Sequence, residues 1–211
     1  MLKLFKYLKK SIIPILFIVF LLIIQAISDL SLPGYTSKII NVGIQQGGIE
    51  DVTPTILRES TFNKILLFLD DEDKTILENS YIKLDKNLLT SDGYNKYFKK
   101  YPLIKEENLY KLKNIDNTNL ERLETILVKP IMMIGAMNSD KMDLSMFFDK
   151  FEVDENTDIF TILAMLPEEK RNNIMNEMNN KMGNLPESII EQSAIEVVKK
   201  EYSIIGIDVN R

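Results

Sequence analysis

Cysteine and histidine are both absent from this chain of 211 residues. Without cysteine no disulfide can form, so the folded part must be stabilised by its apolar packing alone. The missing thiolate and imidazole groups remove the usual zinc and copper ligands, the Ser-His and Cys-His nucleophile pairs, and the most common general base. These absences disfavour an enzyme, and we expect no catalytic residue, cofactor or metal ion in this chain.

Positive charge is in the minority, with 26 Lys and Arg against 31 Asp and Glu and a net charge of −5. The four lysines within the first ten residues have no acidic neighbour there, so they contribute +4 and residues 29–211 carry −9. An acidic surface repels phosphate, which argues against nucleic acid as a partner. It also argues against an anionic membrane surface as a partner of this part.

Long apolar runs are scarce too, with one exception from Ser11 to Ser28 that contains no charged residue. Thirteen of these 18 residues are Ile, Leu, Phe or Val. At ~1.5 Å per residue, a helix over this run is about 27 Å long, close to the ~30 Å hydrocarbon thickness of a bilayer. The lysines in front of the run place the N-terminus in the cytoplasm by the positive-inside rule. We therefore predict a transmembrane helix in the cell membrane.

Two alternatives to a transmembrane helix are a buried core helix and a cleavable signal peptide. A buried core helix is seldom apolar on all faces over this length in so small a chain. A cleavable signal peptide fits the basic N-terminus, and Ala26-Ile27-Ser28 approximates a cleavage site. Cleavage after Ser28 would make the remainder a secreted helical protein.

The residues that follow the apolar run form a more specific pattern. Leu32 and Pro33 come first, then Ile39-Ile40-Asn41 and Gly43-Ile44. Together with the basic N-terminus and the apolar helix, this succession resembles the first transmembrane helix of bacterial ABC exporters. The remainder, with LPEEKRNNIMNEM and the ending EYSIIGIDVNR, resembles the long extracytoplasmic insertion that some multidrug exporters carry between helices one and two.

The resemblance implies a division into three parts: a cytoplasmic N-terminus over residues 1–10, a transmembrane helix with an outer-leaflet extension over 11–48, and a helical extracytoplasmic insertion over 49–211. It also implies that this chain is a fragment of the subunit. The remaining transmembrane helices and a nucleotide-binding domain, which binds ATP and Mg²⁺, would then be partners, together with an identical or different second half-transporter and the lipid bilayer. The resemblance implies ATP-driven export only for the complete assembly.

Gly43 to Gly48 has the G-x-x-x-x-G spacing of a phosphate-binding P-loop. Ile49 and Glu50 stand where that loop requires Lys and Ser or Thr. Since no lysine is placed to meet the phosphates, we reject a nucleotide site here and expect no ATPase motif in this chain.

Leu32, Pro33 and Gly34 are our candidate for a functional irregularity in the helix. Proline removes one helix hydrogen bond and can introduce a kink, on which a gating movement could turn. A fixed bend without a gating role is an equally good interpretation of the same three residues.

After Glu50 the sequence predicts helices throughout. Thr53-Pro54 has the form of a helix start, and the acidic run Asp70 to Asp73 suits the first turn of a second helix. Residues 80–116 are the least periodic, and we expect short helices and loops there. A further helix from Asn117 should end or kink at Lys129-Pro130. The last should run from Pro186 to about Ile205 and end at Gly206.

Three clusters in this region were tested against a functional role. The acidic runs Asp70–Asp73 and Asp154–Asp158 lack the glycine that a calcium loop requires, so both are interpreted as helix starts. The aromatic spacing of Tyr94, Tyr97, Phe98 and Tyr101 and the methionine-rich stretch after residue 131 favour core packing over a ligand surface.

The predicted fold class is all-α: one transmembrane helix and a domain of six or seven short helices. The function that we expect is that of an ABC exporter fragment. The alternative is a single-pass, membrane-anchored helical ectodomain that binds a partner.

Overall fold

The computed structural model describes residues 12–46, 48–49, 51–85, 91–139 and 158–207. The chain divides into two compact units, Met1–Gln45 and Gln46–Arg211. This boundary lies three residues before the predicted one, which ended the membrane-associated part at residue 48. We describe each unit by itself.

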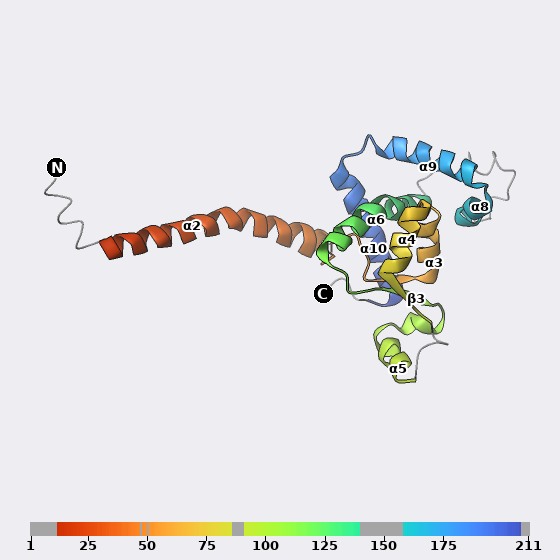
Figure 1. Cartoon of the computed structure of the whole chain (residues 1–211), viewed down its shortest axis with the longest axis horizontal. Helices are drawn as coiled ribbons and strands as arrows, with labels where there is room; N and C mark the ends of the chain where they lie inside the picture. The colour runs from red at the N-terminus through yellow and green to blue at the C-terminus, as the bar shows by residue number, and fades with distance from the viewer. Residues whose placement is uncertain (1–11, 47, 50, 86–90, 140–157, 208–211) are drawn as a thin grey trace. The chain divides into compact units, whose positions relative to one another are not determined.

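From Ile12 onwards the first unit is one continuous helical rod. The α-helix α2 spans Ile12–Lys38 and continues as the π-helix η2 over Ile39–Gln45 (Figure 1). No residue of α2 is buried. The predicted apolar helix is therefore confirmed, and it is longer than the uncharged run of 18 residues that indicated it.

The second unit is mainly helical, and its described residues contain seven α-helices and one short 3-10 helix. The elements are α3 (Glu59–Leu66), α4 (Asp71–Ser80), α5 (Ser91–Lys100), η3 (Pro102–Lys105), α6 (Asn117–Met137), α8 (Ile159–Met165), α9 (Glu168–Met182) and α10 (Glu187–Ile205). The all-α class is confirmed, with one addition.

That addition is a small antiparallel sheet of three strands, β1 (Ile56–Arg58), β2 (Tyr81–Leu84) and β3 (Leu109–Leu112), in the order β1-β3-β2. Tyr110 on β3 pairs with Leu57 on one side and with Lys83 on the other. The expected helix start at Thr53-Pro54 is wrong, because β1 follows there. The prediction of only short helices and loops over residues 80–116 is also wrong, because β2 and β3 lie there. Strands of four residues are too short to show an alternating pattern in the sequence.

The helix ends follow the chemistry of single residues. The Asp70 side chain accepts a hydrogen bond of 2.9 Å from the backbone N–H of Asp73 and caps α4, so the acidic run is a helix start as predicted. Asp116 caps α6 in the same way through Asn119. Gly206 ends α10 in the left-handed conformation with φ of 90°, which confirms the predicted terminus.

α6 does not end at Lys129-Pro130, contrary to one of the two expectations for that site, and runs on to Met137. Proline removes one hydrogen bond from the helix. The two turns beyond it are held by burial of their apolar side chains, which outweighs that loss. These side chains are Ile131, Met133, Ile134 and Met137.

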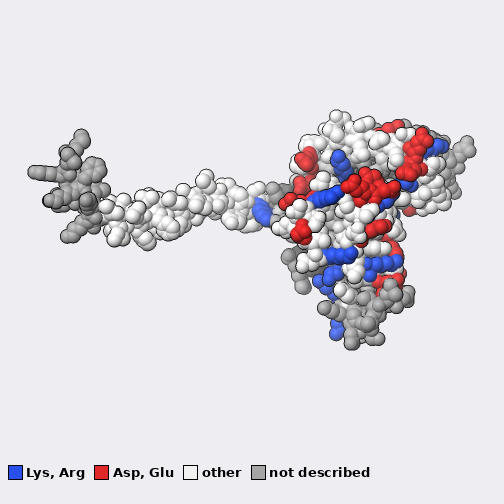
Figure 2. Space-filling model, viewed as in Figure 1, with Lys and Arg blue, Asp and Glu red and all other residues white. Residues whose placement is uncertain are grey.

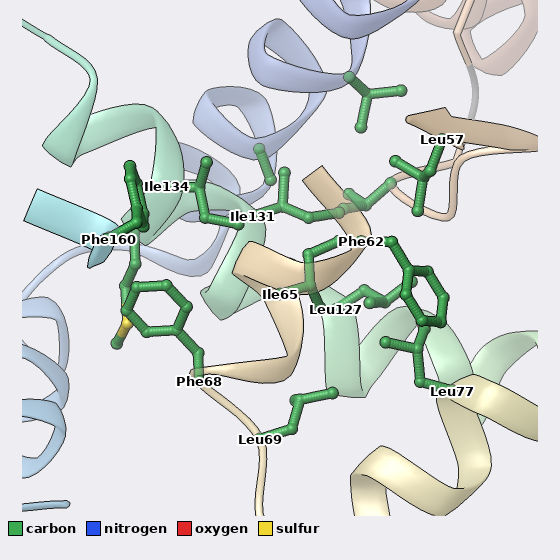
Figure 3. Close-up of a cluster of buried hydrophobic side chains, with 14 of the residues drawn as sticks. Leu57, Phe62, Ile65, Phe68, Leu69, Leu77, Leu127, Ile131, Ile134 and Phe160 are labelled. Atoms are coloured by element: carbon green, nitrogen blue, oxygen red, sulfur yellow. The ribbon is translucent and has the colours of Figure 1, made fainter. Parts of the chain in front are cut away.

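The core lies between α3, α4, α6 and α10 (Figure 1), and Figure 3 shows side chains of α3, α4 and α6 converging on one another. Phe62, Ile65, Leu77 and Leu127 are each at most 2% exposed. Two clusters assigned to the core from sequence also lie there. Met178, Met182 and Tyr101 are buried, and Met175, Tyr97 and Phe98 pack against the core. The side chain of Tyr94 lies outside the described residues.

α6 and α10 form the most extensive contact between elements that the structure describes. Their close approach depends on Gly135, because a Cβ built there would lie 2.2 Å from Cγ2 of Val197. We expect Gly135→Ala to destabilise the domain by about 1–3 kcal/mol, since the β-branched Val197 has little freedom to move away. Urea unfolding of the full chain in detergent, followed by circular dichroism, measures the loss.

Val197→Ala supplies the matched background for this test. Introducing Gly135→Ala into a chain that already carries Val197→Ala should cost much less than introducing it into the unmodified chain, because the clashing methyl group is gone. An equal cost in both backgrounds would show that the close approach is not what requires glycine.

Candidate functional site

From Ile12 to Ile24 the surface of α2 is apolar around its whole circumference. Its large apolar side chains from Ile12 to Ile27 are between 38% and 82% exposed. Figure 2 shows almost no charge on the face of this helix that is in view. The helix is long and apolar enough to cross a membrane.

Leu32, Pro33 and Gly34, the predicted irregularity, lie inside α2 rather than at its end. Pro33 has no N–H, so the carbonyl of Asp29 lacks its usual helical donor. Hydroxyl groups on both sides of the proline bond back to the helix: Ser31 Oγ donates to Ile27 O at 2.7 Å, and Thr36 Oγ1 donates to Leu32 O at 2.9 Å. Such bonds often bend helices, so this stretch combines two causes of local irregularity.

The residues of the exporter-like motif, Ile39, Ile40, Asn41, Gly43 and Ile44, fall together in the π-helix η2. π-Helical turns are rare and are frequent at functional sites. The spacing of these residues does not signal a π-helix, so this conformation differs from the helical extension that the sequence predicts. Because Gly43 is helical, Gly43 to Gly48 does not have the strand–loop–helix setting of a P-loop.

A polar stripe on α2 is formed by Gln25, Asp29 and Thr36. These residues recur at i, i+4 and i+11, so they lie on one face of the helix, and all three are exposed. Counted at ~1.5 Å per residue from Ile12, Gln25 lies about 20 Å and Asp29 about 26 Å along the helix. A hydrocarbon layer of ~30 Å that begins at Ile12 would contain both.

The segment after the membrane-type helix, residues 52–58, is tied to the domain by side chains from distant elements, and we call it the anchor segment. The hydroxyl of Tyr202 accepts a hydrogen bond from Thr55 N at 2.7 Å, and that of Tyr81 donates to Pro54 O at 2.6 Å. Glu124 accepts from the backbone N–H of Val52 at 3.3 Å. Helices α6 and α10 and strand β2 thus satisfy the polar backbone of one short segment.

A buried ion pair closes the C-terminal end of the anchor segment. Both Arg58 Nη2 and Thr61 Oγ1 donate to Glu201 Oε2 at 2.9 Å, and the backbone N–H of Arg58 donates to Glu201 Oε1 at 2.9 Å. The side chain of Glu201 is 5% exposed and that of Arg58 25%. Burial acts to lower the pKa of Arg58, but the hydrogen bond and the charge of Glu201 raise it overall.

Ligands for a metal do not come together in the part of the chain that the structure describes: it contains no cluster of three or more Asp, Glu, His or Cys side chains that could hold an ion. Of the run Asp154–Asp158, residues 154–157 lie outside the described residues. Asp158 occupies the N-cap position of α8, without a side-chain capping bond, so a helix does start at the end of this run.

Comparison of the chain with protein-family models, curated proteins and solved structures found no match. The similarity to ABC exporters therefore rests on the sequence patterns alone, and the exporter interpretation stays a prediction.

Glu201 should be the most sensitive charged position of the domain. We expect Glu201→Gln to lower the free energy of unfolding by about 2–4 kcal/mol, because it leaves Arg58 without its compensating charge. Urea unfolding of the full chain measures this effect. Glu196→Gln on the exposed side of the same helix is the control and should change stability by less than about 0.5 kcal/mol. An equal loss of stability in Glu201→Gln and Glu196→Gln would show that the ion pair between Arg58 and Glu201 contributes no more than an exposed charge.

Glu124 should make stability depend on pH. Burial raises the pKa of Glu124, and the hydrogen bond from Val52 lowers it by less than burial raises it. The negative charges of Asp51, Glu191 and Glu121 raise this pKa further. The folded state therefore takes up this proton more readily than the unfolded state, so stability is lost as pH rises through the folded pKa. Glu124→Gln keeps an acceptor oxygen without the charge, and we expect it to raise Tm by about 2 °C at pH 7.5.

The difference in Tm between Glu124→Gln and the unmodified chain should vanish near pH 4, where the carboxyl is protonated in both states. Glu177→Gln, at an exposed position of α9, should leave Tm unchanged at either pH. A gain that persists unaltered at pH 4 would contradict the electrostatic explanation.

Proposed function

We propose that this chain is the N-terminal part of a bacterial ABC exporter subunit and comprises its first transmembrane helix and a helical extracytoplasmic domain. In this proposal residues 1–10 are cytoplasmic and the domain after about residue 48 lies outside the cell. The chain takes part in ATP-driven transport only together with the remaining helices, the nucleotide-binding domain and a second half-transporter.

The polar stripe is the observation that carries this proposal. Hydrocarbon offers no hydrogen-bond partner, so polar and ionisable side chains at membrane depth face other helices or a water-filled cavity. The side chains of Gln25 and Asp29 are both exposed on α2. A helix that served only as an anchor would have no use for such a stripe, whereas a helix packed among others along a transport pathway would.

The irregular outer part of the rod supports the same proposal. Pro33, the hydroxyl back-bonds around it and the π-helix η2 all occur within one stretch of the chain, beyond the apolar run. Helices that move during transport absorb the change at such interruptions of regular hydrogen bonding. The Leu32–Gly34 step is therefore our candidate for a point of bending during the transport cycle.

One observation favours the alternative of a single-pass anchored module. The unit Gln46–Arg211 has its own core, and its anchor segment is held entirely by groups of that unit. A domain of this kind does not need further membrane helices in order to fold. In the alternative it would bind a partner at the cell surface.

The absence of cysteine makes the topology directly measurable. We expect Lys170→Cys, on exposed α9, to react with a membrane-impermeant maleimide in intact cells, and Lys3→Cys to react only after permeabilisation. The unmodified chain is the blank for both. Labelling of Lys3→Cys in intact cells would overturn the proposed orientation. Loss of the Lys3→Cys chain from the membrane fraction through processing would support secretion instead.

The same orientation is expected of an exporter and of a single-pass module, so a second measurement separates them. Reading the DNA beyond the codon for Arg211 should reveal further apolar helices and a G-x-x-x-x-G-K-[ST] loop in the same frame. A stop codon with no transporter gene beside it would overturn the exporter proposal and leave the anchored module.

A further inference from the structure

The domain contains a cleft of about 620 Å³ between α6 and α10, which lies wholly within the unit Gln46–Arg211. This volume falls in the range of sites for small organic ligands. One face of α10 forms a wall, with residues recurring at helical spacing. These are Ser193, Glu196, Val197, Lys200, Glu201 and Ile204. The last turns of α6 and the residues Arg58, Thr61 and Lys64 complete the lining.

The apolar part of the lining is available to a ligand. Ile204 is 51% exposed and is one of the residues that line the cleft. Met132 is half-buried beside it in the lining, and its flexible thioether can adapt to different apolar shapes. Val197 continues the same apolar surface towards the contact with Gly135.

The polar part carries an excess of positive charge. Glu201 is saturated, because both of its carboxylate oxygens accept hydrogen bonds from Arg58 and one also accepts from Thr61. Apart from the Arg58–Glu201 pair, the charged residues of the lining are therefore two lysines, Lys64 and Lys200, and one carboxylate, Glu196. The ammonium of Lys64 is held 4.1 Å above the ring of Phe160, which restricts its position. A positive cleft in a part of the chain whose net charge is −9 concentrates anions at one place.

Arg58 adds directed donors at the base of the cleft. Its bonds to Glu201 and Thr61 use Nε and Nη2. The N–H groups of Nη1 have no partner among the residues that the structure describes, and the side chain is 25% exposed. A guanidinium fixed by a buried carboxylate is preorganised to receive a second one.

We propose that this cleft binds a small organic acid, with its carboxylate at Arg58, Lys64 and Lys200 and its apolar chain on Met132, Val197 and Ile204. The inference does not rest on the exporter proposal, because every residue of the cleft belongs to the folded domain. It assigns to the domain the recognition of an amphipathic anion.

The test uses the full chain in nanodiscs of zwitterionic lipid, labelled with ¹³C at the methionine methyl groups. Hexanoate is the probe. We expect the Met132 resonance to shift and saturate on titration, while that of Met165, which is 79% exposed on α8, stays in place. Acetate lacks the chain, hexanamide lacks the charge and hexylammonium reverses it, so each should bind at least about tenfold more weakly than hexanoate.

Two variants and a matched control locate the site. Lys200→Gln and Ile204→Ser, both at exposed positions, should each raise the Kd for hexanoate about five- to tenfold. Lys170→Gln removes the same charge from α9, away from the cleft lining, and should leave the Kd unchanged. Circular dichroism of each variant shows whether the fold is retained.

Three results would overturn the proposal. The first is a Met132 resonance that moves no further than that of Met165, and the second is equal binding of hexylammonium and hexanoate. The third is an equal change in Kd for Lys200→Gln and Lys170→Gln, which would mean that general charge attraction explains the binding. None of these results bears on the membrane topology, so the two proposals fail separately.

Discussion

The packing of α6 against α10 is the interaction on which the folded domain depends. A chain without cysteine has no covalent staple, so the core must be stabilised by shape and burial. Gly135 allows the two helices to approach closely enough for Val197 to occupy the space of a missing Cβ. The same helix pair then presents Glu124 from α6 and both Glu201 and Tyr202 from α10 to the anchor segment. One contact thus positions the core, the anchor and the cleft.

The anchor segment marks a change in how backbone polar groups are satisfied. Along α2 the N–H groups beyond the first turn bond within the helix except at Pro33, which is close to the arrangement that a bilayer requires. Between residues 52 and 58 no helix continues, and the N–H and C=O groups are met by side chains and a strand instead. Val52 and Ile56 are fully buried there. The segment is therefore an integral part of the domain core and not a linker.

How much of this could be predicted depended on whether the signal was local. The apolar run indicated α2, the acids after residue 69 indicated the start of α4, and Gly206 indicated the end of α10, because each signal acts within one or two helical turns. The continuation of α6 through Pro130 could not be predicted in this way. It is decided by burial of the turns that follow, and burial depends on what α10 and α3 bring to them.

The sheet and the candidate sites were harder still. β3 pairs with β1 and β2 from parts of the chain that come well before it, and strands so short carry no pattern of their own. Leu32–Gly34 was selected from sequence because proline has a direct local effect. The π-helix that follows was missed, since it differs from an α-helix only in which carbonyl each N–H reaches.

The sequence by itself determined that a long apolar helix lies near the N-terminus, that no disulfide joins the rest, where α4 begins and where α10 ends. These properties follow from residue type and short spacing, and they hold whatever the chain packs against. Only the tertiary structure decided that Arg58 meets Glu201 across 143 residues, and that a positive cleft forms in an acidic domain. Such pairings arise because many weak contacts must be satisfied together, and no single stretch of residues contains that information.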